Sequence, residues 1–140
     1  MRFSRSAAST SMSNCFYIVT DDVSFADYII EQGIVEKDGV TWTYEKWNSG
    51  KAVCYTIVDI PKANDYVLQE TFEYPFSLVS IRCVNATLAT HGGNLSEVLT
   101  DNVKMSARES DIVVAVHRSN GTFENGTTKP VSVEIIGRWQ

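Results

Sequence analysis

Histidine is the side chain that most readily carries protons near neutral pH, and this chain has two, His91 and His117. Neither lies in a metal-ligand spacing such as His-x-x-x-His or His-Glu-x-x-His. His117 ends a run of apolar residues, and His91 precedes the pair Gly92-Gly93. We therefore expect His91 to be a solvated loop residue, and the sequence predicts neither a bound metal ion nor a cofactor.

Three cysteines, Cys15, Cys54 and Cys83, are widely spaced and odd in number. This arrangement fits neither a disulfide framework nor a Cys-x-x-Cys metal site. Cys54 and Cys83 fall inside apolar strand patterns, so we expect both to behave as small buried hydrophobic residues. No environment that would lower a thiol pKa is visible around either, which argues against a nucleophilic role.

Carboxylates are the remaining candidates for acid or base chemistry. Their pairs fall in turns or at strand ends, where charged side chains normally face water. The pairs are Asp21-Asp22, Glu70 with Glu73, and Glu109 with Asp111. The chain also lacks a phosphate-binding glycine loop, a Walker pattern and a G-x-S-x-G elbow. We expect no enzymatic activity, although two carboxylates from separate strands can form a glycosidase pair without any local motif.

Aromatic residues offer a different chemistry, that of contact, and the chain has three Trp, six Tyr and six Phe. Two interpretations are open. Most of these rings can form the core or a subunit interface, because aromatic side chains supply large buried areas. Alternatively, one or two stay exposed as platforms on which sugars stack, with an apolar body and a polar tip.

The bulk composition is that of a folded domain. A chain of 140 residues fits one domain, which buries about two thirds of the surface that its unfolded form exposes. The 12 Lys and Arg are scattered against 17 Asp and Glu, for a net charge of -5, so a nucleic-acid partner is not expected. No apolar run approaches the roughly 20 residues of a membrane-spanning helix, so no membrane insertion is expected.

From Asp27 onward, short β-type runs are separated by Gly, Asn, Asp and Pro at the spacing of a sandwich or barrel. The pattern predicts an all-β, antiparallel fold. Residues 1–20 are predicted to be a flexible N-terminal linker or shaft remnant, and residues 21–140 the β domain. The predicted strands are Tyr28–Gln32, closed by Gly33, then Val40–Trp47, Lys51–Val58, Tyr66–Phe72, Ser77–Leu88, Ile112–His117 and Val131–Ile136.

Two turns define the clearest hairpins. Asp38-Gly39 has the positive-φ chemistry of a tight turn, and Asn48-Ser49-Gly50 forms a short reversal. On the strand between these turns, Trp42 and Tyr44 share one face, while Trp47 lies on the other. On the next strand one face carries Val53, Tyr55 and Ile57, and the opposite face carries Ala52, Cys54, Thr56 and Val58.

Other local signals are weaker. Pro61 is expected to end the strand that begins at Lys51, because proline lacks a donor for the strand ladder. Asn94–Glu97 resembles a capping box and predicts one helical turn, with a strand as an equal alternative. Asn120-Gly121 and Asn125-Gly126 are expected to mark the reversal between the last two strands.

Several strings resemble the C-terminal domain of bacteriophage or prophage tail-fibre and minor structural proteins. They are Asp27–Gly33, the run Trp42–Cys54 with its Trp-Asn-Ser-Gly, the triplet Tyr74-Pro75-Phe76, and the closing Ile136–Trp139. The resemblance covers residues 27–140 and is strongest over 27–54 and at the end. It implies a jelly-roll-like β-sandwich that forms a homotrimeric head at the tail tip of a virion.

On this hypothesis the partners are further copies of the chain, an upstream tail-fibre shaft, and a host cell-surface glycan or protein. Tyr44, Lys46 and Trp47 are predicted to contact the ligand. Trp42, Tyr55 and Trp139 are predicted to be structural or interface residues. Two alternatives stay open: a purely structural domain for trimerisation or capping of the fibre, and a hydrolase of cell-wall or capsule glycans.

Overall fold

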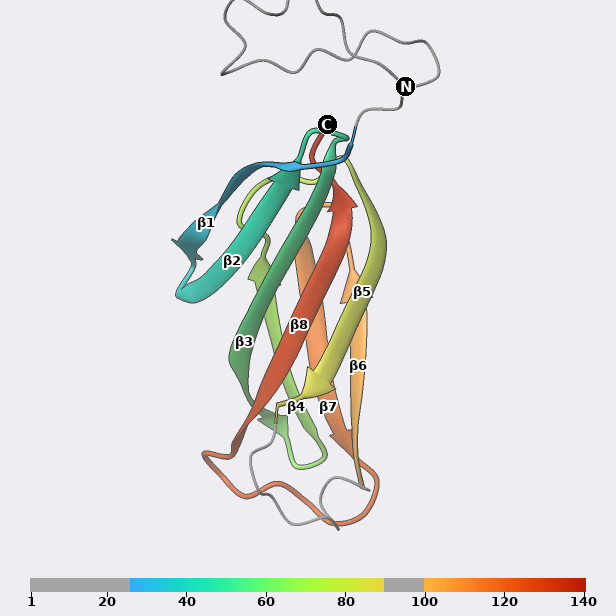
Figure 1. Cartoon of the computed structure of the whole chain (residues 1–140). Coiled ribbons are helices and arrows are strands. Elements are labelled where there is room, and N and C mark those ends of the chain that lie inside the picture. Colours follow the sequence, from blue (N-terminus) through green and yellow to red (C-terminus); the bar gives the residue numbers. More distant parts are fainter. Residues whose placement is uncertain (1–25, 90–99) are drawn as a thin grey trace, which may run out of the picture.

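The structure is a computed structural model that describes residues 26–89 and 100–140. Its elements in these ranges are eight β-strands (Figure 1). The strands are β1 (Ile29–Lys37), β2 (Val40–Trp47), β3 (Lys51–Asn64), β4 (Val67–Glu73), β5 (Ser80–Leu88), β6 (Asp101–Ala107), β7 (Asp111–Arg118) and β8 (Thr128–Arg138).

The strands form two antiparallel layers. The front layer in Figure 1 has the order β1-β2-β3-β8-β5, and the back layer has the order β4-β7-β6. The last residues of β3 also pair with β4, so the hydrogen bonding continues from one layer into the other. The predicted all-β antiparallel sandwich is confirmed.

The path of the chain is jelly-roll-like. Strands β3, β8 and β5 lie in one layer, while β4, β7 and β6 lie in the other. The chain therefore crosses between layers after β3, β4, β5 and β7, as in double-sheet jelly rolls. The hairpin of β1 and β2 widens the front layer by two strands beyond this unit.

The core lies between the two layers and follows the two-residue period of the strands. Ala52, Cys54 and Ile60 point inward from β3, and Val131, Val133 and Ile135 point inward from β8. Each fully buried aliphatic or aromatic side chain contributes roughly 1.5–3 kcal/mol relative to an exposed one. The largest fully buried residues are Trp42, Tyr74, Phe123, Ile60, Leu68, Ile112 and Ile135.

Both predicted hairpins are present. Asp38 and Gly39 have φ values of 51° and 78°, the positive pair of a type I′ turn, which matches the twist of β1 and β2. In the β2–β3 turn, Gly50 has a φ of 88° and donates its backbone N–H to the Trp47 oxygen at 2.9 Å. Of the two predicted faces of β3, the one with Ala52, Cys54 and Thr56 points inward.

The prediction that Gly33 closes the first strand is wrong, because β1 continues through it to Lys37. Gly33 lies opposite Tyr44 of β2, and the Tyr44 ring covers the position that a Cβ would occupy, with Cε1 at 3.4 Å. A cross-strand ring thus compensates for the missing side chain of a strand glycine.

The prediction that Pro61 ends its strand is also wrong, since β3 extends to Asn64. Pro61 lies opposite Thr128 at the end of the ladder with β8, and Lys62 already pairs with Leu68 of β4. The missing N–H of Pro61 falls where β3 leaves one layer for the other, so it interrupts neither ladder.

Asn120-Gly121 and Asn125-Gly126 do not form a reversal between paired strands. They lie in the connection from β7 to β8, which belong to different layers. Gly121 and Gly126 have φ values of 88° and 81°, so the glycines serve turns within a crossover. The capping-box segment Asn94–Glu97 lies outside the described residues, as do His91 and Cys15.

The two described cysteines differ. Cys54 is buried, as expected, and burial raises the pKa of its thiol to about 12. The expectation for Cys83 is wrong, because this residue is exposed on β5. A register shift between Ile81 and Cys83 turns Cys83 to the outer face of the sheet.

Candidate interaction surfaces

An aromatic cluster fills the end of the sandwich where the β2–β3 turn lies. The Lys46 ammonium lies 4.6 Å from the Phe76 ring centroid, 5.3 Å from that of Trp139 and 5.7 Å from that of Tyr44. Tyr44 and Phe76 meet edge to face with centroids 5.4 Å apart. Cation–π contacts of this kind stabilise a partly buried lysine by about 0.5–2 kcal/mol each.

Glu31 of β1 holds this cluster from outside. The Tyr44 hydroxyl donates to Glu31 Oε1 at 2.8 Å, and the Lys46 ammonium donates to Oε2 at 3.1 Å. These two hydrogen bonds, that from Tyr44 first, lower the pKa of the Glu31 carboxyl. The same carboxylate raises the pKa of the Tyr44 hydroxyl. Tyr44 and Lys46 are thus fixed by contacts within the chain.

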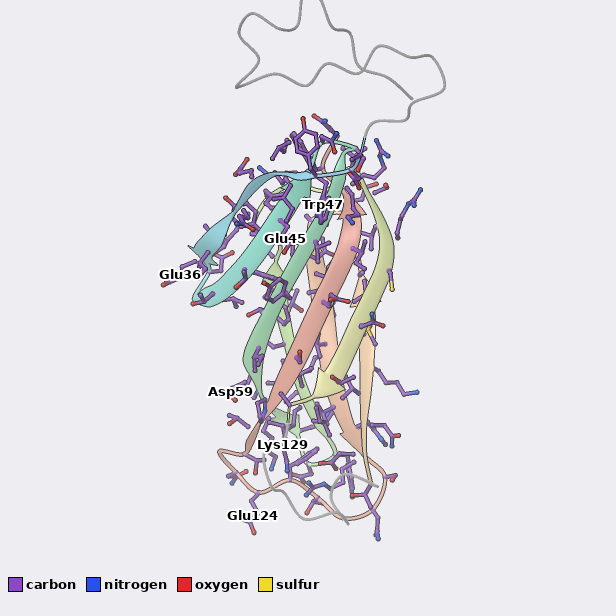
Figure 2. All side chains as sticks on the ribbon, viewed as in Figure 1. Glu36, Glu45, Trp47, Asp59, Glu124 and Lys129 are labelled. Atoms are coloured by element: carbon purple, nitrogen blue, oxygen red, sulfur yellow. The ribbon has the colours of Figure 1, made fainter. Side chains whose placement is uncertain are left out.

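Trp47 lies on the opposite, outer face of β2 (Figure 2). The Lys51 ammonium lies 3.8 Å from its ring centroid, and its backbone oxygen accepts a hydrogen bond from Trp139 Nε1 at 3.2 Å. Its own indole N–H is buried and has no hydrogen-bond partner among the described residues. The structure therefore brings Tyr44 and Lys46 together and places Trp47 apart from them. Their role in binding a ligand stays a prediction.

The three residues predicted to be structural occupy different places. Trp42 is fully buried, with its ring centroid 5.9 Å from that of Phe72. Trp139 is half-buried and packs against the core. Tyr55 is 42% exposed and stands on the outer face of β3.

The outer face of the front layer carries a row of neighbours that crosses all five strands. Ladder partners place Ile34, Thr43, Tyr55, Glu134 and Asn85 side by side. Because cross-strand partners point to the same side of a sheet, their side chains share this face.

Apolar side chains dominate the middle of this outer surface. We call this part the outer apolar face and define it by Ile34, Val53, Tyr55 and Ile57. Ile34 is 73% exposed and Ile57 is 64% exposed. Soluble monomers rarely leave large apolar side chains grouped in this way, and such patches mark surfaces that contact other molecules. The signal was present in the sequence, because both alternating faces of β3 are apolar.

At the other end of the sandwich, an ion pair anchors the β7–β8 connection. Asp101, 6% exposed, accepts two hydrogen bonds from the Arg118 guanidinium, at 2.8 and 2.9 Å. The guanidinium also lies 4.1 Å from the Phe123 ring centroid, and it donates to the Thr122 oxygen at 3.3 Å. The connection is therefore held by its own side chains.

Among the described residues, three carboxylates share one groove. Asp38, Asp59 and Glu70 line an open groove of about 430 Å³ between the β1–β2 turn and β3. Within residues 26–89 and 100–140, no three His, Cys, Asp or Glu side chains are placed to hold a metal ion. His117 is exposed on β7. No helix in the described part of the chain is long and apolar enough to cross a membrane.

No protein-family model matches the chain, and no curated protein matches it by sequence. Two solved structures match the chain in fold. One is the R1 pyocin fibre of P. aeruginosa, with a TM-score of 0.53 and 14% identity over 77% of this chain. The other is an N-truncated R1-type pyocin tail fibre, with a TM-score of 0.53 and 13% identity over 77% of this chain.

The likeness is one of fold. It covers 28% of the first fibre chain and 86% of the second, so this chain spans much less than the length of the first. The expected resemblance to C-terminal domains of tail-fibre proteins is confirmed at that level.

Proposed function

We propose that this chain is a tail-fibre head domain, which assembles as a homotrimer at the tail tip and binds a host cell-surface glycan. The fold shared with R1 pyocin fibres over 77% of the chain carries the proposal. Residues 1–20 would join the domain to the fibre shaft. Three linked sites would bind a glycan-covered surface far more tightly than a single site does.

The outer apolar face supports the assembly part of the proposal. Its exposed side chains, Ile34, Tyr55 and Ile57, lie on a broad five-stranded surface instead of in a pocket, which suits contact between large molecules. Identical chains gain closed symmetry when such a face meets a second region of a neighbouring copy. We assign this face to contacts between copies.

Sedimentation equilibrium tests the assignment. The wild-type domain should be a trimer, whereas Ile57→Glu should be a monomer, because a carboxylate would be buried in the contact. Tyr66→Glu is the matched control, since Tyr66 is also exposed but lies in the β3–β4 turn, away from the face. A wild-type monomer would contradict the trimer, and a trimeric Ile57→Glu variant would contradict the choice of face.

A glycan array and binding to host cells test the recognition part. The proposed contact residues are Tyr44, Lys46 and Trp47, of which Trp47 stands on the outer side of β2. Trp47→Ala should weaken glycan binding at least about tenfold, as removal of a tryptophan hot spot does, while circular dichroism shows an unchanged fold. A trimer that binds no glycan and no host cell would instead favour a purely structural cap.

The groove lined by Asp38, Asp59 and Glu70 allows a specific test of the alternative that the domain is a glycan hydrolase. The domain is incubated with host polysaccharide and reducing sugar is measured, for the wild type and for Asp59→Asn. Sugar release that disappears in Asp59→Asn would replace the binding function with a hydrolytic one. We expect no release from either protein.

A further inference from the structure

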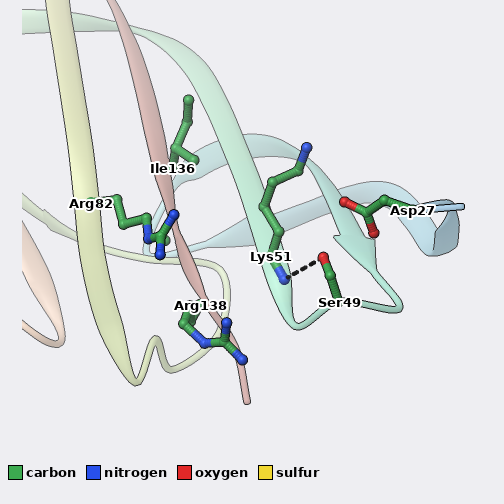
Figure 3. A pocket seen from close by; sticks show the side chains of 7 residues that line it. Asp27, Ser49, Lys51, Arg82, Ile136 and Arg138 are labelled. Atoms are coloured by element: carbon green, nitrogen blue, oxygen red, sulfur yellow. Dashed lines mark hydrogen bonds between the residues drawn. The ribbon is translucent and has the colours of Figure 1, made fainter. Parts of the chain in front are cut away.

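Three cationic side chains from three strands gather at the end of the front layer where the β2–β3 turn lies (Figure 3). Lys51 of β3 and Arg138 of β8 are direct partners in the antiparallel ladder. Arg82 comes from β5, on the other side of β8. Figure 3 shows Arg82, Arg138 and Lys51 in this order across the sheet, with Asp27 beyond Lys51.

A β-bulge places Arg82 in this group. Ile81 pairs with Gly137 and Cys83 pairs with Ile136, so Arg82 is the extra residue between two ladder positions. Without the bulge, strict alternation would put Arg82 and Cys83 on opposite faces of the sheet. The bulge exposes both and brings the guanidinium beside Ile136 and Arg138. Bulges are common next to functional sites because they re-aim a side chain in this way.

These side chains surround a pocket of about 260 Å³. Two guanidinium groups, an ammonium group and a hydroxyl group supply hydrogen-bond donors, and the Asp27 carboxylate supplies an acceptor. The lining residues are Asp27, Ser49, Lys51, Arg82, Ile136, Gly137 and Arg138.

The concentration of positive charge in this pocket favours binding of an anion. Like charges directly opposite each other destabilise a sheet, yet Lys51 and Arg138 are ladder partners and Arg82 adds a third cation. This happens in a chain whose net charge is -5. Among the described residues, neither Arg82 nor Asp27 has an ion-pair partner.

The other two cations are held in place by uncharged groups. The Lys51 ammonium stacks on the Trp47 ring at 3.8 Å, and Arg138 Nε donates to the Gln140 backbone oxygen at 3.1 Å. Gly50 makes room for the Arg138 guanidinium, because a Cβ there would lie 2.7 Å from Nη2. The Lys51 and Arg138 donors are therefore positioned before any ligand arrives, which lowers the entropic cost of binding.

We propose that the pocket of Lys51, Arg82 and Arg138 binds the carboxylate or phosphate group of an acidic sugar in a surface glycan. The guanidinium groups match the geometry of oxyanions and bind them through paired hydrogen bonds. Asp27 accepts a hydrogen bond from a sugar hydroxyl, and Ile136 offers an apolar wall to the C–H side of the ring. The volume is slightly below the roughly 300–1,000 Å³ of drug-sized pockets and suits a single sugar unit.

The glycan context of this site rests on the proposed function, but its chemistry is tested without a host. Titration of the assembled domain with D-glucuronate, glucose 6-phosphate and neutral glucose, followed by NMR, separates carboxylate, phosphate and uncharged ligands. We expect at least one acidic sugar to bind and to shift the resonances of Lys51, Arg82 and Arg138, with affinity that falls as salt is added. Equal binding of glucose, or no binding of either acidic sugar, would overturn the site.

Arg82→Gln keeps the length and polarity of the side chain and removes its charge. It should weaken acidic-sugar binding at least about tenfold, the effect of losing one charge-assisted contact of about 1.5–3 kcal/mol. Lys104→Gln is the matched control, because Lys104 is exposed on β6 in the other layer and should leave binding unchanged. Equal affinities in the two variants would refute the pocket.

The two proposals fail separately. If host-cell binding survives in Arg82→Gln at full strength, the domain recognises its host but this pocket is not the site. If the domain binds no host cell while glucuronate or glucose 6-phosphate still binds at Arg82, the pocket stands and the proposed function falls.

Discussion

At the scale of single residues, the buried charge of Asp101 is paired on both of its carboxylate oxygens. Asp101, 6% exposed, receives both hydrogen bonds of a bidentate contact with Arg118, and the Lys129 ammonium approaches it to 4.0 Å. The pair of Lys62 with Asp65 has the same distance of 2.8 Å, but its carboxylate side chain is 69% exposed. Distance alone therefore does not rank these ion pairs by stability, and burial does.

Asp101→Asn should lower the free energy of unfolding by about 3–5 kcal/mol, because it removes the charge of a buried carboxylate that two hydrogen bonds join to Arg118. Asp65→Asn, which breaks an exposed pair, should cost no more than about 1 kcal/mol. Urea unfolding followed by tryptophan fluorescence measures both. Equal losses in the two variants would contradict the ranking by burial.

Glu31 gives the stability a predictable dependence on pH. Its folded-state pKa lies below the ordinary value of 4.5, because Tyr44 and Lys46 hydrogen-bond to the ionised form. The stabilisation is therefore complete above pH 4.5 and is lost as the pH falls through the lower folded-state value. Glu31→Gln should be less stable than the wild type at neutral pH, and this difference should shrink on acidification.

Urea unfolding of both proteins at about pH 7 and about pH 3 checks this sign. Tyr44→Phe removes the hydrogen bond that lowers the Glu31 pKa most, so it should reproduce part of the effect. A difference between wild type and Glu31→Gln that grows in acid would refute the assigned direction.

At the scale of elements, the turns can be predicted from the local sequence, whereas the pairing of strands that are distant in the sequence cannot. The sequence Asp38-Gly39 was sufficient to predict the first hairpin, and alternation around Asn48 predicted the second. The sequence gives no local sign that β8 pairs with β3 and β5, or that β7 and β8 lie in different layers. Those partners are chosen by burial of complementary faces across the whole chain.

The same limit explains the errors in strand ends and in the candidate surfaces. Pro61 and Gly33 are local signals for ending a strand, but contacts in the fold override both. After Pro61, β3 pairs with β4, and at Gly33 the Tyr44 ring fills the place of a side chain. The pocket around Arg82 could not be predicted, because a bulge changes which face a residue occupies without altering the sequence pattern.

The β2–β3 turn offers a matched pair of glycine substitutions. Gly50 and Gly126 both have positive φ, of 88° and 81°, but a Cβ at Gly50 would lie 2.8 Å from the Gln140 oxygen, whereas none of the described atoms lies within 4 Å at Gly126. Gly126→Ala should cost about 1 kcal/mol of backbone strain, and Gly50→Ala should approach about 3 kcal/mol. Chemical denaturation of both variants measures the difference, and equal costs would contradict the steric part.

At the scale of the whole molecule, the Cys54 thiol in the core between the layers can be used to measure global unfolding. Cys54 is fully buried and its thiol pKa is raised to about 12, chiefly by burial, so almost no thiolate is present at neutral pH. In a protein that carries Cys15→Ser and Cys83→Ser, Cys54 is the single thiol.

We expect that thiol to resist a disulfide reagent in the native protein and to react fully in denaturant. Its labelling rate should follow the global unfolding rate as denaturant is added, because no local motion exposes the centre of a sandwich. The reaction is followed by absorbance of the released thiolate. Rapid labelling without denaturant would show that β3 separates from its neighbours locally.

The described chain enters and leaves the sandwich at the same end. The Tyr28 backbone oxygen accepts a hydrogen bond from Asn48 at 3.0 Å, and Trp139 donates its N–H to Gly50, also at 3.0 Å (Figure 1). Both ends thus meet at one turn, so a short bridge from Gln140 to Ala26 and a cut between Asn120 and Gly121 would give a circular permutant. In that permutant the new termini, and any label fused to them, would lie at the opposite end of the sandwich, in the β7–β8 connection.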